Sequence, residues 1–315
     1  MTLRVGAFGP AILTLCLGLA LALGGCQGGE GPREAPGVSV AAPSDGVPAW
    51  ELVYDLEVDG NADLWAVSAS VAEPRRLTNS PGYDGMARFT PDGQRIVFSS
   101  ERTGNWQLFE IATGGGAARR IRSNDATEYQ ADPSADGRTL AFLTDLDGPE
   151  RLVTMDLATG QLRELVRHGK RTIFGNPSWS PDGSTITFSS NWRIGHQIYV
   201  VDVASGEARR ISALTSGGCE PRFMPDGRVC YVNRGHMGGS RSTLVAVDLE
   251  TGEEDVLVDW PALNYDPAFS PDGSEIAFAS NITGEYVIYR QRLSDRKAWR
   301  VTFGPGAARY PDYRP

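Results

Sequence analysis

A short turn recurs along this chain at nearly constant intervals, and this periodicity limits the folds that are possible. The turn reads Pro-Asp-Gly at four places and Ala-Asp-Gly at a fifth, with its aspartates at Asp92, Asp136, Asp182, Asp226 and Asp272. Successive aspartates are 44, 46, 44 and 46 residues apart. Proline presets φ, aspartate accepts hydrogen bonds from its own turn, and glycine allows positive φ. A period of this length is typical of a repeat architecture.

Each repeat contains four short apolar runs, which predict four β-strands. In the central copy, Trp179 lies in the first run, and Ile186 and Phe188 share one face of the second. A third run covers residues 197–200, and a short arginine-containing run closes the unit at residues 209–211. Three copies join the last two runs by an Asp-x-x-x-Gly turn that begins at Asp156, Asp202 and Asp248. Four antiparallel strands at this period fit one blade of a β-propeller.

The two ends of the sequence carry complementary parts of one repeat. Residues 311–315 match a first strand, whereas residues 50–54, 63–67 and 74–77 match a second, third and fourth strand. The last strand is therefore predicted to complete the N-terminal blade and to close the ring, so that no blade edge stays open between the termini. The 267 residues from 49 to 315 accommodate six repeats. We predict an all-β, six-bladed propeller with four antiparallel strands per blade; an unclosed stack of β-repeats is the alternative.

Composition argues against several classes of partner. The formal net charge is −9, and nucleic-acid binding requires a basic surface, so no nucleic-acid partner is expected. The four cysteines form no Cys-x-x-Cys pair, which makes a structural zinc site improbable. Arginines in the predicted outer strands are expected to discourage pairing with other chains, which favours a monomer. These are Arg75, Arg76, Arg119, Arg120, Arg163, Arg209 and Arg300.

Residues 1–25 have the pattern of a bacterial lipoprotein signal peptide. Arg4 supplies a positive start, and the apolar run over residues 11–23 is too short to span a membrane comfortably. The sequence Leu-Gly-Gly-Cys that ends at Cys26 resembles a lipobox, in which the cysteine is lipidated and becomes the new N-terminus. Such an anchor attaches a protein to a membrane without threading it through. An ordinary secretory signal with a chance cysteine is the alternative.

Residues 26–48 predict a flexible tether between this anchor and the propeller, which is assigned to residues 49–315. The segment is dominated by glycine, proline, alanine and serine and has few bulky apolar residues. Gln27 follows the cysteine where an aspartate would favour retention at the inner membrane. The expected location is therefore the outer membrane, facing the periplasm.

Cys219 and Cys230 are predicted to be free thiols. If Phe223 pairs with Val229 across the neighbouring turn, Arg222 lies opposite Cys230. Strand alternation then places Cys219 on the other face, out of reach of a disulfide.

The repeated pattern (Pro)-x-(Trp/Phe)-Ser-Pro-Asp-Gly-x-x-(Ile)-x-Phe-x-Ser, followed by Ile-Tyr-Val-x-Asp and Arg-Arg-(Ile/Leu)-(Ser/Thr), resembles the TolB-type six-bladed β-propeller family over about residues 49–315. TolB has an α/β domain before its propeller and is a soluble periplasmic protein, whereas this chain has a tether and a lipobox there. The resemblance implies an envelope propeller that binds another protein at one end of its channel. It is specific for the fold but weak for function, because propellers host many activities.

A candidate binding site follows from propeller topology. Loops that enter the inner strands, and loops that join second to third strands, open on one face, here called the entry face. Residues just ahead of the inner strands are expected to surround the channel there, namely Asp84, Glu128, Asn176, Glu220, Asp266 and Tyr310, with Tyr83, Tyr129, Phe174 and Tyr265 beside them. Such a funnel would suit a cation or a cationic or amphipathic segment of a partner protein. The alternative is a water-filled channel whose aromatics pack between blades.

Enzymatic readings find less support. His168, His196 and His236 fall on the entry face, and the oligogalacturonate lyases, which act on saccharides, share similar repeats and use metal-bound histidines. The loops that carry these histidines are unrelated in sequence, so no metal or cofactor is predicted. Residues 55–60 are similar to a calcium loop, but Ala66 stands where the twelfth-position glutamate is needed. No Gly-x-Ser-x-Gly elbow occurs. The prediction is a non-enzymatic protein-binding scaffold.

Overall fold

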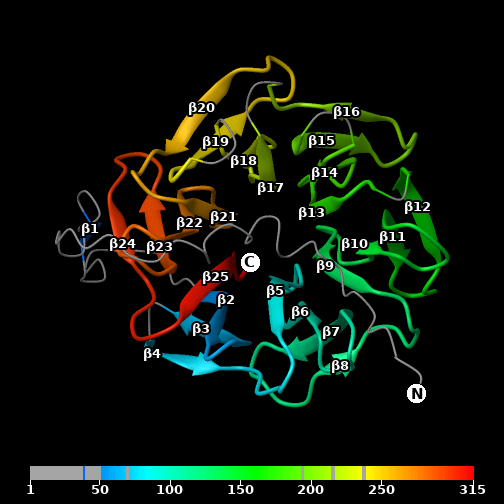
Figure 1. Cartoon of the computed structure of the whole chain (residues 1–315), viewed down its shortest axis with the longest axis horizontal. Helices are drawn as coiled ribbons and strands as arrows, with labels where there is room; N and C mark the ends of the chain where they lie inside the picture. Colours follow the sequence, from blue (N-terminus) through cyan, green and yellow to red (C-terminus); the bar gives the residue numbers. More distant parts are fainter. Residues whose placement is uncertain are drawn as a thin grey trace, which may run out of the picture.

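The computed structural model describes residues 38–39, 51–68, 71–169, 171–192, 195–213, 217–235 and 239–315. These residues form six β-sheets arranged around a central axis (Figure 1). The predicted six-bladed, all-β propeller is thereby confirmed. In the described part of the chain, no helix is long and apolar enough to cross a membrane.

Each blade has four antiparallel strands, ordered here from the channel outwards. Blade 1 consists of β25 (Ala307–Tyr313), β2 (Glu51–Val58), β3 (Asn61–Ser68) and β4 (Val71–Arg76). Blade 2 consists of β5 (Asp84–Phe89), β6 (Arg95–Ser100), β7 (Gln107–Ala112) and β8 (Arg119–Arg120). Blade 3 consists of β9 (Glu128–Pro133), β10 (Thr139–Thr144), β11 (Arg151–Asp156) and β12 (Leu162–Arg167).

The remaining blades repeat the same order. Blade 4 consists of β13 (Phe174–Trp179), β14 (Thr185–Ser190), β15 (Gln197–Asp202) and β16 (Ala208–Arg210). Blade 5 consists of β17 (Gly218–Phe223), β18 (Val229–Asn233), β19 (Thr243–Val247) and β20 (Glu254–Val258). Blade 6 consists of β21 (Asn264–Phe269), β22 (Glu275–Ser280), β23 (Val287–Arg292) and β24 (Ala298–Arg300).

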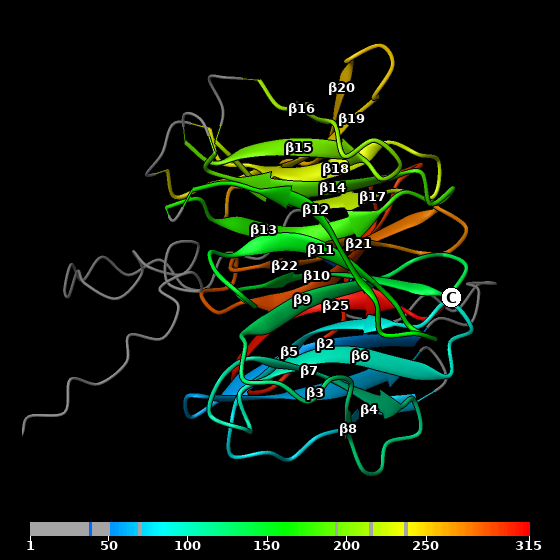
Figure 2. The same ribbon diagram turned by 90° about the vertical axis from the view of Figure 1, so that its right-hand side faces the viewer.

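The C-terminal strand closes the ring as predicted. Strand β25 pairs with β2, with Tyr313 opposite Leu52 and Arg309 opposite Asp55. Figure 2 shows the red C-terminal strand beside the blue N-terminal blade. The two parts of one repeat, which lie at opposite ends of the sequence, therefore combine into a single sheet.

Blade 6 has a fifth strand from the predicted tether. Strand β1 (Val38–Ser39) pairs in parallel with β24, with Val38 opposite Ala298. This pairing satisfies backbone groups on an outer edge that would otherwise face solvent. The other residues of the tether, and the predicted signal peptide with Cys26, lie outside the described residues.

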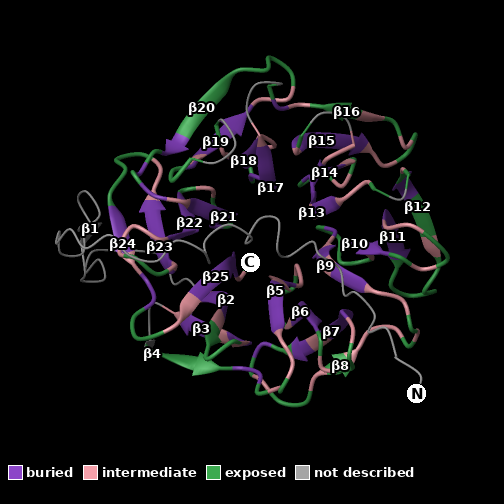
Figure 3. Ribbon diagram, viewed as in Figure 1, coloured by how far each residue is buried: buried purple, intermediate pink, exposed green. Residues whose placement is uncertain are grey.

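The recurring turn folds for the reason that its sequence indicates. In blade 4, Ser180 Oγ donates to Asp182 Oδ1 at 2.6 Å, and the backbone N–H of Ser184 donates to the same oxygen at 3.0 Å. Gly183 has φ of 72°, which favours glycine. The turn directs Ile186 and Phe188 into the interface between blades, where both are fully buried. Figure 3 shows the inner strands buried and the outer strands β4, β12 and β20 exposed.

Every inner strand contains a β-bulge at an equivalent position. The pairing register shifts there by one residue in each blade, because the inner strand has one residue more than its partner. One residue of each bulge has φ between 50° and 55°, although none is glycine: Met86, Gln130, Asn176, Glu220, Asp266 and Tyr310. Such a left-handed residue bends the strand and turns its backbone N–H out of the ladder.

Both cysteines of the propeller are free thiols, as predicted. The predicted pairs Arg222–Cys230 and Phe223–Val229 also occur. The predicted face of Cys219 is wrong, because the bulge at Glu220 inserts one extra residue and places Cys219 opposite Val232. Cys219 and Cys230 therefore lie in the same apolar cluster, and burial raises the pKa of the Cys230 thiol.

Closure by β25 leads to a stability prediction. Tyr313 is buried against the blade 6–blade 1 interface, so Tyr313→Ala is expected to lower the free energy of unfolding by about 3–5 kcal/mol. The matched control is Leu157→Ala, at a side chain that is 44% exposed, where a change within about 0.5 kcal/mol is expected. Urea denaturation measures both, and equal losses would contradict a closing role for β25.

Candidate site in the central channel

The bulges bring an acidic cluster to the entry side of the channel. The N–H of Asp266 donates to Glu220 Oε2 at 2.7 Å, and the N–H of Tyr310 donates to Asp266 Oδ2 at 3.2 Å. The N–H of Met86 donates to Asp55 Oδ2 at 2.8 Å. In each case a side chain of one blade accepts from the bulge of the next, so the acids also join neighbouring blades.

Arg309 lies at the centre of this cluster. Its guanidinium bonds to Asp266 through Nε and through Nη2, the latter at 3.2 Å, and its Nη2 is 3.4 Å from Glu220 Oε1. Tyr265, Tyr286 and Tyr310 surround the guanidinium with ring centroids 4.7–5.2 Å from its central carbon. This arrangement holds a buried cation between two carboxylates and three aromatic faces.

Asp55 is the least compensated acid of the cluster. Its side chain is 1% exposed, and Oδ1 is buried without a hydrogen-bond partner among the described residues. Burial raises the pKa of Asp55 well above its usual value, and Asp266 adds to this shift, while the Met86 N–H and the charges of Arg88 and Arg309 oppose it. An unpaired buried carboxylate oxygen is costly. Its cost falls when a proton or another cation reaches it.

A second set of charges crosses the channel closer to the recurring turns. Arg222 of blade 5 donates through Nη1 to Asp132 of blade 3 at 2.9 Å and through Nη2 to Asp312 of blade 1 at 2.6 Å. The same two carboxylates accept the N–H groups of Trp179 and Phe89, each at 2.8 Å. Arg222 therefore ties together three alternate blades.

On the opposite face from the entry face, these charges form the floor of a central pocket of about 320 Å³. All six blades contribute to its wall. Phe223 and Phe269 are among the aromatic side chains that line it, and Pro181, Pro225 and Pro271 are exposed at its rim. The channel is thus crossed by ion pairs between its two mouths.

The six residues predicted to surround the channel occupy two different kinds of position in the structure. Asn176, Glu220, Asp266 and Tyr310 occupy equivalent bulge positions inside the inner strands. Asp84 and Glu128 lie two residues before the corresponding bulges and are fully buried. Asp84 accepts from Ser100 and Arg102, and Glu128 accepts from Arg122 and Asn124. Met86 and Gln130 are the bulge residues of blades 2 and 3.

Five of the predicted site residues are aromatic if Tyr310 is counted. Tyr83 is half-buried, and the other four are buried. Tyr265 packs on Arg309, Tyr129 donates from its hydroxyl to Glu150, and Phe174 lies beside Phe188. These rings pack within and between blades, in line with the packing alternative described above.

The histidines do not form a metal site within the described residues. His168 stacks on Trp192 with ring centroids 3.7 Å apart, and burial lowers its pKa. Burial also lowers the pKa of His196, with Arg234 adding to the effect. His236 lies outside the described residues. Within the described ranges, no group of three or more His, Cys, Asp or Glu side chains could hold a metal ion.

Sequence reasoning missed the residues that organise the channel. Asp55, Arg309, Asp132, Arg222 and Asp312 were not among the predicted site residues. A usable signal exists, since aligning the repeats places Asp132, Arg222 and Asp312 at one position two residues after the bulge. A charge at that position interrupts a strand whose other residues are largely apolar or small.

Fold and channel together define a six-bladed β-propeller whose blades are joined by buried polar groups at the axis. A family model described as the TolB beta propeller domain matches residues 34–172 and 134–259. The chain belongs to this TolB β-propeller family.

Three individual proteins illustrate the similarity. The uncharacterized peptidase YuxL of Bacillus subtilis is 30% identical over 152 residues, which make up 37% of this chain and 23% of the peptidase. The structure of TolB from Acinetobacter baumannii matches with a TM-score of 0.73 and 22% identity, covering 84% of this chain and 67% of that one. An oligogalacturonate lyase in complex with manganese has a TM-score of 0.57 and 17% identity, covering 80% and 73% of the two chains.

The reach of these similarities is limited to the propeller. The match to the peptidase spans about a quarter of that protein's length. At 22% and 17% identity, the two structural matches establish a shared fold.

The ion pairs across the channel lead to a pH-dependent prediction. Arg222→Met removes the cation that bonds to both Asp132 and Asp312 and leaves them Arg88, 3.6 Å from Asp132, so it is expected to cost up to about 3–5 kcal/mol of stability at pH 7. Burial raises the pKa of Asp312 in the folded state, and loss of Arg222, which opposes this shift, raises it further. The folded variant then binds more protons than its unfolded form, and its stability falls as pH rises above about 4.

Thermal or urea unfolding at pH 7 and pH 4 tests this directly, with the deficit expected to be smaller at pH 4. Arg228→Met is the matched control, because Arg228 pairs with Asp226 at the surface and should cost about 1 kcal/mol or less. A deficit that is independent of pH would show that lost packing, and not charge, causes the effect.

Proposed function

We propose that this protein is a non-enzymatic, lipid-anchored binding protein of the bacterial cell envelope. Its propeller holds a protein partner at the entry mouth of the channel, and it acts as a monomer. The anchor is the lipidated Cys26, and Gln27 favours the outer membrane with the propeller in the periplasm. Membership of the TolB β-propeller family supports an envelope protein that binds another protein.

The observation that carries the proposal is the excess of acid around Arg309. Glu220 and Asp266 bond to this guanidinium, whereas Asp55, on the paired strand, is not hydrogen-bonded to it and keeps Oδ1 without a hydrogen-bond partner among the described residues. A lysine, an arginine or an amino terminus of the partner would supply the missing charge at the buried carboxylate. Half-buried Gln130, Asn176 and Tyr286 nearby provide polar and aromatic surface for such a segment.

Asp55→Asn tests the role of this carboxylate with little disturbance of the fold. The amide oxygen of asparagine can still accept from the Met86 N–H, while the ionisable group is removed. Recovery of the partner from chemically cross-linked envelopes is expected to fall at least tenfold, in keeping with the loss of one charge-assisted contact of about 1.5–3 kcal/mol.

Asp136→Asn is the matched control, because Asp136 is an exposed turn residue on the opposite face and its replacement should leave recovery unchanged. Thermal unfolding of Asp55→Asn at pH 7 is expected to be no lower than that of the wild type, since a buried charge has been removed. Undiminished partner recovery with Asp55→Asn would contradict binding at this mouth.

The lipid anchor is tested separately by Cys26→Ser. This substitution removes the acceptor thiol, so the protein is expected to move from the membrane fraction to the soluble fraction and to lose incorporation of labelled palmitate. Cys219→Ser, which changes a buried thiol of the propeller, should leave both readouts unchanged. Membrane association that persists in Cys26→Ser would refute the anchor.

A further inference from the structure

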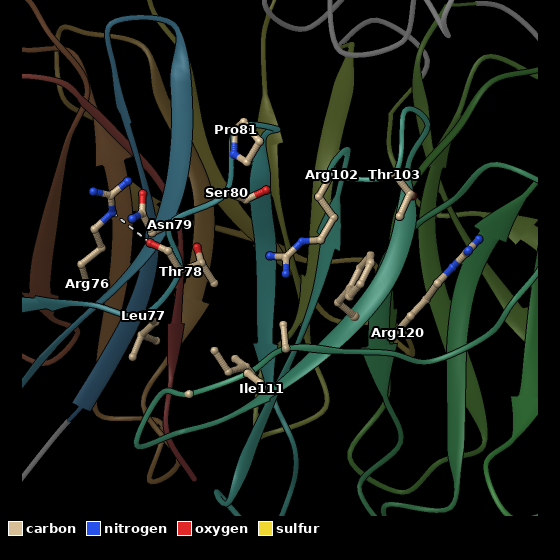
Figure 4. A pocket seen from close by; sticks show the side chains of 14 residues that line it. Arg76, Leu77, Thr78, Asn79, Ser80, Pro81, Arg102, Thr103, Ile111 and Arg120 are labelled. Carbon is tan, nitrogen blue, oxygen red and sulfur yellow. Dashed lines mark hydrogen bonds between the residues drawn. The ribbon is translucent and has the colours of Figure 1, made fainter.

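An open cavity of about 860 Å³ lies between the outer strands of blades 1 and 2 (Figure 4). Its apolar floor is formed by Leu77, Phe109 and Ile111, which are buried. Its polar rim comes from the chain around β4 and from the β6–β7 turn. The volume falls in the range of small-molecule binding sites, which combine an apolar lining with a few fixed polar groups.

The charged side chains that line this cavity are all basic. Arg76, Arg102 and Arg120 line it, and none of its lining residues is acidic, although the chain has a net charge of −9. The neighbouring cavities in this repeat architecture differ. The cavity between blades 2 and 3 includes Glu110 among its acids, and a cavity between blades 3 and 4 includes Asp156. The positive lining is therefore particular to the blade 1–blade 2 interface among these three.

Two of the three guanidinium nitrogens of Arg102 are hydrogen-bonded within the protein. Its Nη2 donates to Asp84 at 2.7 Å and its Nε donates to Ser100 Oγ at 2.9 Å, while the guanidinium lies 4.7 Å from the centroid of Phe109. Its Nη1 has no hydrogen-bond partner in the described part of the chain. Figure 4 shows Arg102 reaching into the space between the two sides of the cavity.

Arg76 and Arg120 are anchored in the same way. Arg76 donates through Nη2 to Asp63 and through Nε to the carbonyl of Thr78, whereas Arg120 donates to the Gln107 amide oxygen and the Asn124 carbonyl. Neither Nη1 group bonds to another described residue. Arg120 thus has neutral acceptors only. Guanidinium groups that are already fixed lose little entropy when they bind an anion.

The turn between the last two strands of blade 2 departs from the repeat. Blades 3, 4 and 5 join their last two strands by an Asp-x-x-x-Gly turn, but in blade 2 the aspartate position is Ala112 and the turn contains Gly114, Gly115 and Gly116. Gly115 and Gly116 have φ of 89° and 113°, which side chains rarely adopt. The turn therefore contributes no bulky side chain to the cavity wall, where Gly116, Ala117 and Ala118 lie.

We propose that this cavity binds an organic oxyanion, in which a carboxylate, phosphate or sulfate group is joined to an apolar body. The oxyanion accepts from the free Nη1 groups of Arg76 and Arg102 and from Ser80 and Asn79 on the rim. The apolar body covers Leu77, Phe109 and Ile111. The site is independent of the channel and of the partner proposed for it.

Isothermal titration calorimetry with naphthalene probes tests the site on the full propeller. 2-Naphthoate, 2-naphthalenesulfonate and 2-naphthyl phosphate differ in the oxyanion, and 2-naphthylmethanol has the same apolar body without charge. At least one anion is expected to bind with one-to-one stoichiometry and a Kd below about 1 mM. The alcohol should bind at least tenfold more weakly, and the order of the three anions identifies the preferred head group.

Two variants locate the binding. Arg76→Gln removes a half-exposed donor and should weaken anion binding about tenfold. Arg119→Gln is the matched control: Arg119 precedes Arg120 in β8 but lines the neighbouring cavity, so removing its charge should have no effect. Ala117→Phe fills the cavity from the glycine-rich turn and should abolish binding. The proposal is overturned if no probe saturates, if Arg76→Gln and Arg119→Gln weaken binding equally, or if Ala117→Phe leaves it intact.

Discussion

The left-handed bulge in each inner strand is the constraint on which the propeller depends. A non-glycine residue in this conformation costs about 1–2 kcal/mol, and the chain adopts it once in every blade. The conformation is maintained because the freed N–H groups of Met86, Gln130, Asn176, Asp266 and Tyr310 each find an acceptor in the preceding blade. The strained bulge residues thus donate the hydrogen bonds that join neighbouring blades. An isolated blade would have the strain of its bulge without these hydrogen bonds.

This constraint also places the charges at the axis. Because the bulge shifts the register, residues on either side of it face the channel, and Arg222 can reach Asp132 and Asp312 on alternate blades. Buried ion pairs of this kind add specificity of arrangement more than net stability. The entry side differs, since Asp55 Oδ1 has no hydrogen-bond partner among the described residues. That difference makes the entry mouth the better candidate for binding a charged partner.

Repetition made the fold predictable, and departures from repetition made the site unpredictable. The spacing of Asp92, Asp136, Asp182, Asp226 and Asp272 and the split repeat at the termini were sufficient to predict six blades and their closure. The bulges leave no pattern that strand alternation can detect, so Cys219 was placed on the wrong face. For the same reason Asp84 and Glu128 were aligned with bulge residues that lie two positions later.

The predicted role of the aromatics suffered from a related difficulty. Tyr129 and Phe174 follow polar segments and were therefore expected at the channel mouth, but the structure places them at the start of β9 and β13, where both are buried.

Pairing of strand β25 with β2 has a separate consequence for synthesis of the chain. The β2, β3 and β4 strands of blade 1 are made before the other blades, but β2 lacks its inner partner until residues 307–313 have left the ribosome, so its edge must be kept from other unpaired strands during that interval.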